Sequence, residues 1–451
     1  ARKHTLKLCS SQILNPQTRS RTEMEGKRAP AAAAAAISAV LDDDDLLGEI
    51  LLRLAFPTSL VRAALVCKRW LLHAAAPAFL RRFRGLHQPS LLGFYVVSTA
   101  IHPPRFVALP QPPELADVVR RGSFDLDSLG PDRFDLDCWN GLLLLSTFEM
   151  YPDRTMNPTR VRCPLYPARD TAILPTVPIT SIHHDGFTYH DREILVSGSG
   201  GQCLSYFCLA IMDKEQQTVV DVYALQQGTW TIYSSSVTEI PRIGLLLPST
   251  LIGDTNKIYN VAFVNNSYKL ILLDLVSASL SLVNFPEEVK GLSFELSLTD
   301  DSQLHLIHVK GSQLRIWLHR MDSNGVSNWL LERTICLREI CANYRIPTCM
   351  FKDGSDSAFT RMHAVGVNAE FVFLEMEDVL YLFDIKSKAA KQVYKMTPED
   401  NILNSVIPFM MVWPPKFPAM KEMQDPTELP CTVCLLSIFL VPSSIFQCPL
   451  C

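Results

Sequence analysis

From about Leu91 onward, the chain consists of short runs of β-forming residues, which are separated by residues typical of turns. A single two-stranded hairpin is marginally stable in water, so runs of this length need neighbouring strands. The pattern predicts an all-β domain over residues 90–415, which could be a sandwich, a barrel or a propeller. Representative runs cover residues 92–97, 257–264, 269–273, 313–318 and 379–383.

A weak internal repeat favours the propeller among these architectures. Each unit has a strand, a polar turn, a second strand and often a proline at its exit, and the units recur at roughly 45–65 residues, close to the ~40–50 residues of known propeller repeats. An irregular β-sandwich with similar hairpins is the alternative. Three units begin at Asp221, Leu273 and Phe383.

Residues 42–83 show helical spacing instead. Four aspartates, 42–45, precede a leucine-rich run, and acidic groups at that place stabilise a helix N-terminus. Pro57 and Pro77 interrupt the pattern, which predicts three short amphipathic helices in a domain spanning residues 38–84. So small a domain cannot hide all of its leucines, so we expect an exposed apolar patch that binds a partner.

The motif in this helical stretch resembles the F-box family. It runs Leu46-Leu47-Gly48-Glu49-Ile50-Leu51-Leu52-Arg53-Leu54, continues through residues 59–62 to Leu65-Val66-Cys67-Lys68-Arg69-Trp70, and ends with Pro77-Ala78-Phe79-Leu80. In the family this surface binds a Skp1-type subunit, which links to a cullin. Carried over by position, the resemblance implies these contact or core residues: Leu46, Leu47, Ile50, Leu51, Leu54, Leu60, Val66, Cys67 and Trp70.

The chain departs from the F-box pattern at the start of the motif. F-boxes usually open with Leu-Pro, but here those places hold Asp42 and Asp43, and Leu41 stands one position too early. We therefore expect the opening anchor to be displaced or weakened.

The β region also resembles the propeller-like C-terminal region of large plant F-box families, through residues 136–144, 314–317 with Trp329, and 381–384. The predicted fold class is thus α+β multidomain, with a small F-box followed by a large all-β domain. The implied function is that of a non-catalytic substrate-recognition adaptor of an SCF-type E3 ubiquitin ligase, in the nucleus or cytoplasm, with an unknown protein as its target. Two alternatives stay open: a ligase-independent protein- or glycan-binding module with a degenerate F-box, and a propeller enzyme with convergent charged residues in a central channel.

Composition and motifs argue against other classes. With 42 basic and 46 acidic residues the net charge is −4, whereas a nucleic-acid-binding domain is usually strongly basic. His305 and His308 are three residues apart in a strand pattern, which places them on opposite faces. We find no catalytic set and predict no cofactor.

The two ends of the chain predict little structure. Residues 1–37 are expected to be a disordered, low-complexity N-terminus. Because residues 1–23 are basic, an organelle transit peptide is the alternative interpretation of that stretch. Residues 416–451 are expected to be a disordered tail, in which the apolar run 435–441 is too short to span a membrane. We predict no metal site; the weak zinc candidates are the pairs Cys431, Cys434 and Cys448, Cys451.

Overall fold

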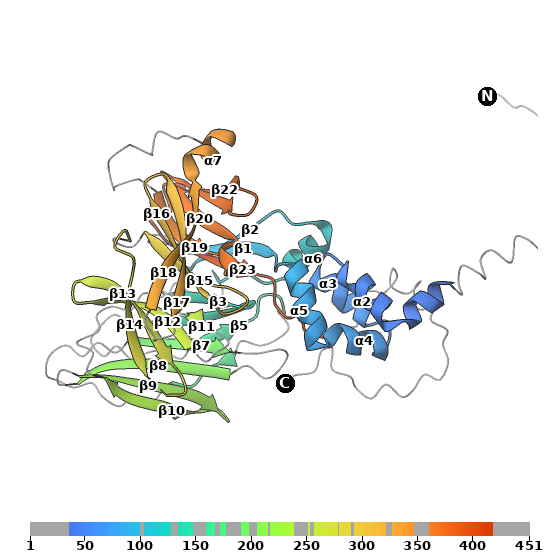
Figure 1. Ribbon diagram of the computed structural model, residues 1–451, viewed down its shortest axis with the longest axis horizontal. Coiled ribbons are helices and arrows are strands. Elements are labelled where there is room, and N and C mark those ends of the chain that lie inside the picture. Colours follow the sequence, from blue (N-terminus) through green and yellow to red (C-terminus); the bar gives the residue numbers. More distant parts are fainter. Residues whose placement is uncertain are drawn as a thin grey trace, which may run out of the picture. The chain divides into compact units, whose positions relative to one another are not determined.

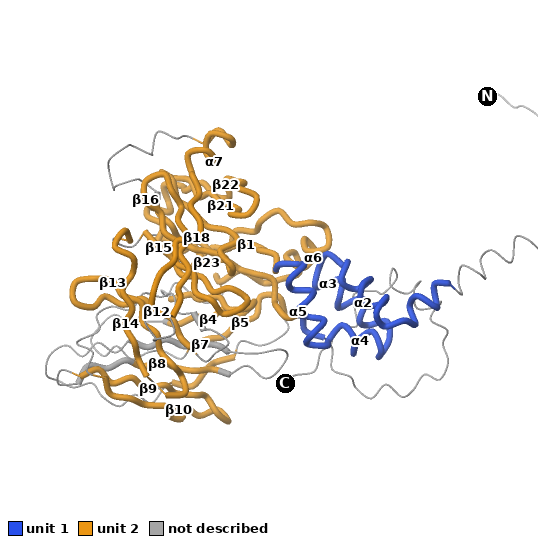
Figure 2. Tube along the Cα trace, in the orientation of Figure 1, with its two compact units in different colours: residues 1–88, 415–451 blue, residues 89–414 orange. Residues whose placement is uncertain are grey.

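The computed structural model forms two compact units, Ala1–Gln88 with Pro415–Cys451, and Pro89–Pro414 (Figure 2). The expectations for residues 1–35, for the apolar run 435–441 and for the four C-terminal cysteines lie outside the described residues. The structure describes residues 36–99, 103–127, 134–147, 159–166, 172–176, 191–197, 205–214, 217–238, 251–252, 257–277, 279–289, 293–321, 327–346 and 360–417.

The first unit is helical (Figure 1). Residues 36–42 form a helix, and after Asp43 four further helices follow: α2 (Asp44–Leu52), α3 (Pro57–Ala64), α4 (Lys68–Ala75) and α5 (Pro77–Leu86). Pro57 and Pro77 stand at the first position of α3 and α5, where a missing N–H costs no hydrogen bond.

The helical stretch differs from the three helices expected over residues 42–83. The second expected helix is divided into two helices, α3 and α4, because the chain leaves the helical conformation at Cys67 (φ −160°, ψ 167°). Gly48 of α2 faces His73 of α4, and an added Cβ at this glycine would lie 2.8 Å from the His73 Nε2 atom. A glycine at this position therefore allows α2 and α4 to pack closely.

The second unit consists of antiparallel sheets, in which consecutive strands of the chain pair as hairpins. In the described residues there are five four-stranded sheets and one three-stranded sheet. The four-stranded sheets are β3 (Phe134–Trp139), β4 (Leu142–Thr147), β5 (Arg160–Arg162) and β6 (Ala172–Ile173); β7 (Asp191–Ser197), β8 (Ser205–Lys214), β9 (Gln217–Gln226) and β10 (Thr229–Thr238); β11 (Leu251–Ile252), β12 (Lys257–Val264), β13 (Ser267–Asp274) and β14 (Leu280–Asn284); β15 (Phe294–Leu298), β16 (Leu304–Lys310), β17 (Gln313–Met321) and β18 (Ser327–Cys336); and β19 (Thr360–Val365), β20 (Phe371–Met376), β21 (Val379–Asp384) and β22 (Ala389–Lys395).

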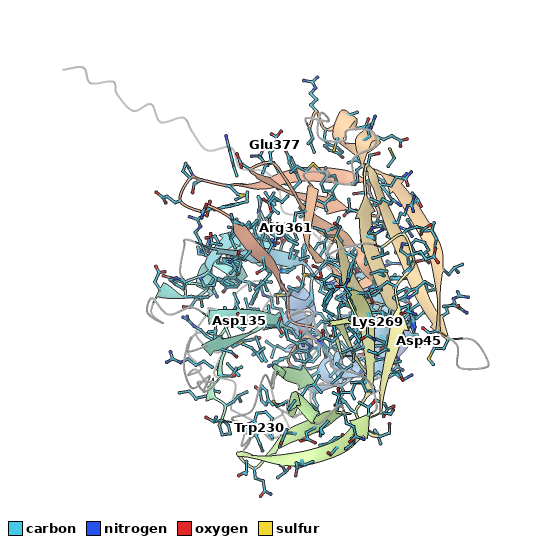
Figure 3. The ribbon with its side chains drawn as sticks, turned by 90° about the vertical axis from the view of Figure 1, so that its left-hand side faces the viewer. Asp45, Asp135, Trp230, Lys269, Arg361 and Glu377 are labelled. Atoms are coloured by element: carbon cyan, nitrogen blue, oxygen red, sulfur yellow. The ribbon has the colours of Figure 1, made fainter. Side chains whose placement is uncertain are left out.

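The three-stranded sheet joins the two ends of the unit. Its strands are β1 (Leu91–Ser98), β2 (Arg105–Ala108) and β23 (Leu403–Met410), and β1 pairs with β23 so that Tyr95 lies opposite Ile407. Strand β23 also contacts β3 and β19, which belong to the first and last four-stranded sheets. The sheets therefore follow one another around a common centre in a closed ring (Figure 3), which confirms the predicted propeller over the sandwich.

The hairpin turns show how the local sequence sets this pattern. Positive φ angles occur at both turn residues of Asn140-Gly141 (47° and 78°), Gln227-Gly228 (51° and 79°) and Asn265-Asn266 (50° and 63°). These are the conformations of tight two-residue hairpins, which asparagine and glycine adopt at low cost. The three repeat units of the sequence correspond to the outer hairpins β9–β10, β13–β14 and β21–β22.

In the described part of the second unit, two small α-helices accompany the sheets. Helix α6 (Pro113–Arg121) follows β2, and α7 (Leu337–Asn343) follows β18. The largest core cluster contains side chains from β12 to β22, including Trp317, Phe294 and Phe383. Each sheet thus buries its faces against its neighbours, as the propeller architecture requires.

Candidate functional site

Helix α2 separates its apolar side chains into two groups. Leu47, Leu51 and Leu52 are buried in the core of the helical unit. Leu46 and Ile50, four residues apart on one side of the helix, are 46% and 37% exposed. The helical unit therefore keeps apolar surface that its own core does not cover.

The other predicted contact residues divide in the same way. Leu60 and Trp70 are buried, so they belong to the core, while Leu54, Val66 and Cys67 are partly exposed. The structure thus assigns Leu47, Leu51, Leu60 and Trp70 a packing role within the unit, and leaves the remaining five accessible to a partner.

Sequence reasoning missed exposed leucines on α4 and α5 and misplaced Leu65; on α5, Leu86 is 64% exposed. Leu72 on α4 is 54% exposed and Leu65, between α3 and α4, is 49% exposed. Leu72 is two residues after the buried Trp70, about 200° further around the helix, which is a signal that the helical period could have given. Leu65 was expected inside a continuous helix, and its exposure follows from the break before α4.

An arginine and an aspartate join the helix of residues 36–42 to α2. The Asp43 side chain caps α2, because its Oδ1 accepts hydrogen bonds of 2.9 Å from the backbone amides of Asp45 and Leu46. The Arg69 guanidinium of α4 donates to the carbonyl oxygens of Leu41 and Asp42, each at 2.6 Å. Those carbonyls end the preceding helix, where a cation is favourable.

The same guanidinium also holds the first turn of α2. Its terminal nitrogen lies 2.7 Å from the Asp44 carboxylate, so one side chain ties both helices to α4. The side chain of Leu41 is buried at 6% exposure. The opening leucine, displaced in the sequence, therefore still packs into the core of the helical unit.

The two histidines of β16 have different surroundings. His305 lies 3.2 Å from the Glu332 carboxylate on β18. His308 is buried opposite Arg315 in the register, and burial together with the Arg315 and Lys310 charges lowers the pKa of His308 to about 4. An imidazole with this pKa is neutral at pH 7 and does not act as a general acid there.

Acidic side chains lie on strands of different sheets in the propeller. Burial raises the pKa of Glu295 on β15 to about 8, and burial raises the pKa values of Asp135 and Asp137 on β3 (Figure 3 labels Asp135). Within the described ranges, no three His, Cys, Asp or Glu side chains are grouped so that they could hold a metal ion. No helix there is long and apolar enough to cross a bilayer.

A buried polar network, which sequence reasoning also missed, ties β2 to the chain after β22. The Asp400 carboxylate is fully buried and accepts hydrogen bonds from the Tyr394 hydroxyl at 2.8 Å and the Thr397 amide at 2.7 Å. Arg105 of β2 lies 3.2 Å from the same carboxylate. The four groups are far apart in sequence or separated by a turn, so no local motif indicates them.

Comparisons with solved structures find distant similarity. The GH93 alpha-L-arabinofuranosidase of Fusarium graminearum shares 12% identity over 58% of this chain and 80% of that chain, with a TM-score of 0.33. A protein from Lactobacillus plantarum shares 10% identity over 58% of this chain and 70% of that chain, with a TM-score of 0.30. Values this low support no conclusion about activity or ligand. A search of curated proteins found no match.

A family model gives the decisive match. It is described as F-box protein AT5G49610-like, beta-propeller, and it matches residues 136–417, which is more than half of the chain. The match covers β3 to β23 and therefore nearly all of the closed ring of sheets. The chain belongs to the F-box protein AT5G49610-like, beta-propeller family.

Proposed function

We propose that this protein is the substrate-recognition adaptor of an SCF-type E3 ubiquitin ligase. In this role the helical unit binds a Skp1-type subunit, which links it to a cullin, and the propeller binds the target protein. The protein itself is not catalytic. It raises the effective concentration of target lysines near the conjugating enzyme, in the nucleus or cytoplasm.

The observation that carries the proposal is the exposed pair Leu46 and Ile50 within a motif of the F-box type, in a chain of an F-box propeller family. The two side chains stand beside a well-packed core, so the surface that they form is held in place before binding. A pre-organised apolar surface loses little conformational entropy on association, and Leu65 and Leu72 add further exposed apolar area.

The test is binding of the 451-residue chain to a purified Skp1-type subunit. Replacing Leu46 and Ile50 together by aspartate places two charges on the proposed interface and should abolish co-purification. Trp70 is not a suitable position, because it is buried and its loss would unfold the unit. The matched control is Leu330→Asp, a leucine of 50% exposure on β18 of the propeller.

The docking proposal fails if the Leu46→Asp, Ile50→Asp variant is folded and still binds the subunit like the wild type. Far-ultraviolet circular dichroism and urea denaturation establish that the variant is folded.

One observation favours a second candidate, a protein-binding module that works outside any ligase. Asp42 and Asp43 occupy the places where the F-box pattern has Leu-Pro. The burial of Leu41 offsets part of this departure. Failure of the wild-type chain to bind a Skp1-type subunit at micromolar concentration would favour the second candidate.

A further inference from the structure

Each sheet of the propeller ends in an outer strand. In the part of the chain that the structure describes, no strand pairs with the outer edge of β2, β6, β10, β14, β18 or β22. Such an edge presents backbone N–H and C=O groups to solvent, and proteins usually protect it by shortness, charge, proline or bulges. The six edges can therefore be compared within one molecule.

Five of the six edges have the usual protection. Strands β2, β6 and β14 are short, with four, two and five residues. Strand β18 is long but carries Glu332 and Arg333, and β22 carries Lys391 and Lys395. A charged side chain on an edge disfavours pairing with another strand, since the charge would lose water on pairing.

Strand β10 is neither short nor charged, and of the usual protections it has only the register shift between Ile232 and Ser234. Its ten residues, Thr229–Thr238, include no charged residue, no proline and no glycine. Ile232, Tyr233 and Val237 are 61%, 47% and 60% exposed. Long, uncharged strands rich in β-branched and aromatic residues are those that most readily accept another strand.

The register places the apolar side chains of this edge on one face. Ile232 lies opposite Tyr223 and Val237 lies opposite Val219 of β9, and residues 223 and 219 are on the same face because four residues separate them. A strand added beside β10 would place alternate side chains next to Ile232 and Val237. The register shifts between Ile232 and Ser234, so the edge has two short straight parts.

Side chains fix β10 in place from both neighbouring sheets. The Trp230 indole N–H donates to the carbonyl oxygen of Pro175, after β6, at 2.7 Å. The Ser234 hydroxyl donates to the carbonyl oxygen of Leu275, after β13, at 2.7 Å. The edge is therefore held in strand geometry before any partner arrives, which lowers the entropic cost of binding.

We infer that the outer edge of β10 binds an extended, uncharged segment of the target protein by β-strand addition. This inference rests on the proposed function, because it names the chemistry of the target. Main-chain hydrogen bonds supply affinity, and residues with β-branched or aromatic side chains beside Ile232 and Val237 supply selectivity. A charged residue of the added strand beside Ile232 or Val237 would lose water, and β10 has no opposite charge with which it could pair.

A second copy of the chain fits the same edge less well. Two β10 strands paired with each other would bring together two long edges that each contain a register shift, and two rigid sheets cannot both adapt. A flexible segment of four or five residues fits either straight part. Self-association is therefore an outcome for the experiment to exclude.

The experiment uses the full chain and a fluorescein-labelled octapeptide of alternating threonine and valine. Fluorescence polarisation should show saturable binding, at least tenfold weaker for Ile232→Lys with Val237→Lys. The matched control, Leu330→Lys with Leu331→Lys on the exposed part of β18, should bind like the wild type. Hydrogen–deuterium exchange should show peptide-induced protection of residues 229–238 and none in β18.

A second probe keeps the test decisive if the β10 variant does not fold. The same octapeptide with every backbone nitrogen methylated retains its side chains and has no N–H donor on either edge, so it should bind wild-type protein at least tenfold more weakly. Equal binding of both peptides overturns the inference, as does equal binding by the β10 and β18 variants.

Two further readouts separate the remaining outcomes. Concentration-dependent dimerisation in sedimentation velocity that the β10 variant abolishes, without peptide binding, would overturn the inference in favour of a second copy. Binding of the β10 variant to a Skp1-type subunit should equal that of the wild type. Loss of peptide binding and loss of Skp1-type binding are therefore independent results, so failure of the inference and failure of the proposed function can be distinguished.

Discussion

Replacement of Leu46 and Ile50 by alanine measures what the exposed face of α2 contributes to binding. Fully burying a leucine or isoleucine side chain contributes about 1.5–3 kcal/mol. Because 46% of Leu46 and 37% of Ile50 is exposed, a partner can bury only that share, about 0.7–1.4 and about 0.6–1.1 kcal/mol respectively. The double variant should therefore weaken binding of the Skp1-type subunit by about 1.3–2.5 kcal/mol, roughly 10- to 60-fold in Kd.

A buried neighbour provides the contrast. Leu47, on the same helix, is fully buried, so Leu47→Ala should lower the free energy of unfolding by about 2–5 kcal/mol. The double variant at Leu46 and Ile50 should leave this free energy within about 0.5 kcal/mol of the wild type. Urea denaturation measures the free energy of unfolding, and isothermal titration calorimetry measures Kd.

These two measurements can refute the reasoning. If the folded double variant binds the subunit with unchanged Kd, the exposed face of α2 is not the interface. If it unfolds as readily as Leu47→Ala, Leu46 and Ile50 serve the core and their exposure has been misjudged. Leu330→Ala, on β18, is the control for unspecific loss of an exposed leucine.

Three further outcomes concern stability. Arg69→Met removes the donors to the two helix-end carbonyls and should cost the helical unit about 1–3 kcal/mol in urea denaturation. Burial raises the pKa of Glu295 from 4.5 to about 8. Between these pH values the native state holds a proton that the unfolded state releases, so the free energy of unfolding falls as pH rises. Glu295→Gln should remove this pH dependence, which thermal denaturation at pH 6 and 8 measures. Burial opposes ionisation of Asp400, but hydrogen bonds from Thr397 and Tyr394 and the Arg105 charge lower its pKa. The stability that the ionised carboxylate contributes is therefore lost as pH falls below about 4. Asp400→Asn should make the free energy of unfolding depend less on pH in this acidic range.

Local signals predicted the elements of the propeller well. The runs at 257–264 and 379–383 correspond closely to β12 and β21, and turn pairs such as Asn265-Asn266 adopt the positive φ angles that tight hairpins need. Alternation and turn chemistry act within a few residues, so the sequence displays them directly. The break before α4 was not predicted, because Leu65, Val66 and Cys67 continue an apolar pattern without a proline or glycine.

The candidate site was predicted as a set of residues and not as a surface. The motif named nine positions, and helical spacing showed that they could not all be buried, but it did not show which ones stay exposed. That division depends on how α2, α4 and α5 pack, which sets Leu47 inward and Leu46 outward. The position of Leu41 depends in the same way on Arg69, 28 residues further along the chain.

The sequence by itself determined that this chain has an F-box-like helical stretch followed by many short strands, since helical and strand periods are properties of neighbouring residues. Only the tertiary structure decided that β23 pairs with β1 to close the ring, which leucines remain outside the core, and which long outer strand has an edge without charge. Each of these depends on contacts between residues far apart in the chain. The pattern along a single segment does not specify its partner in such a contact.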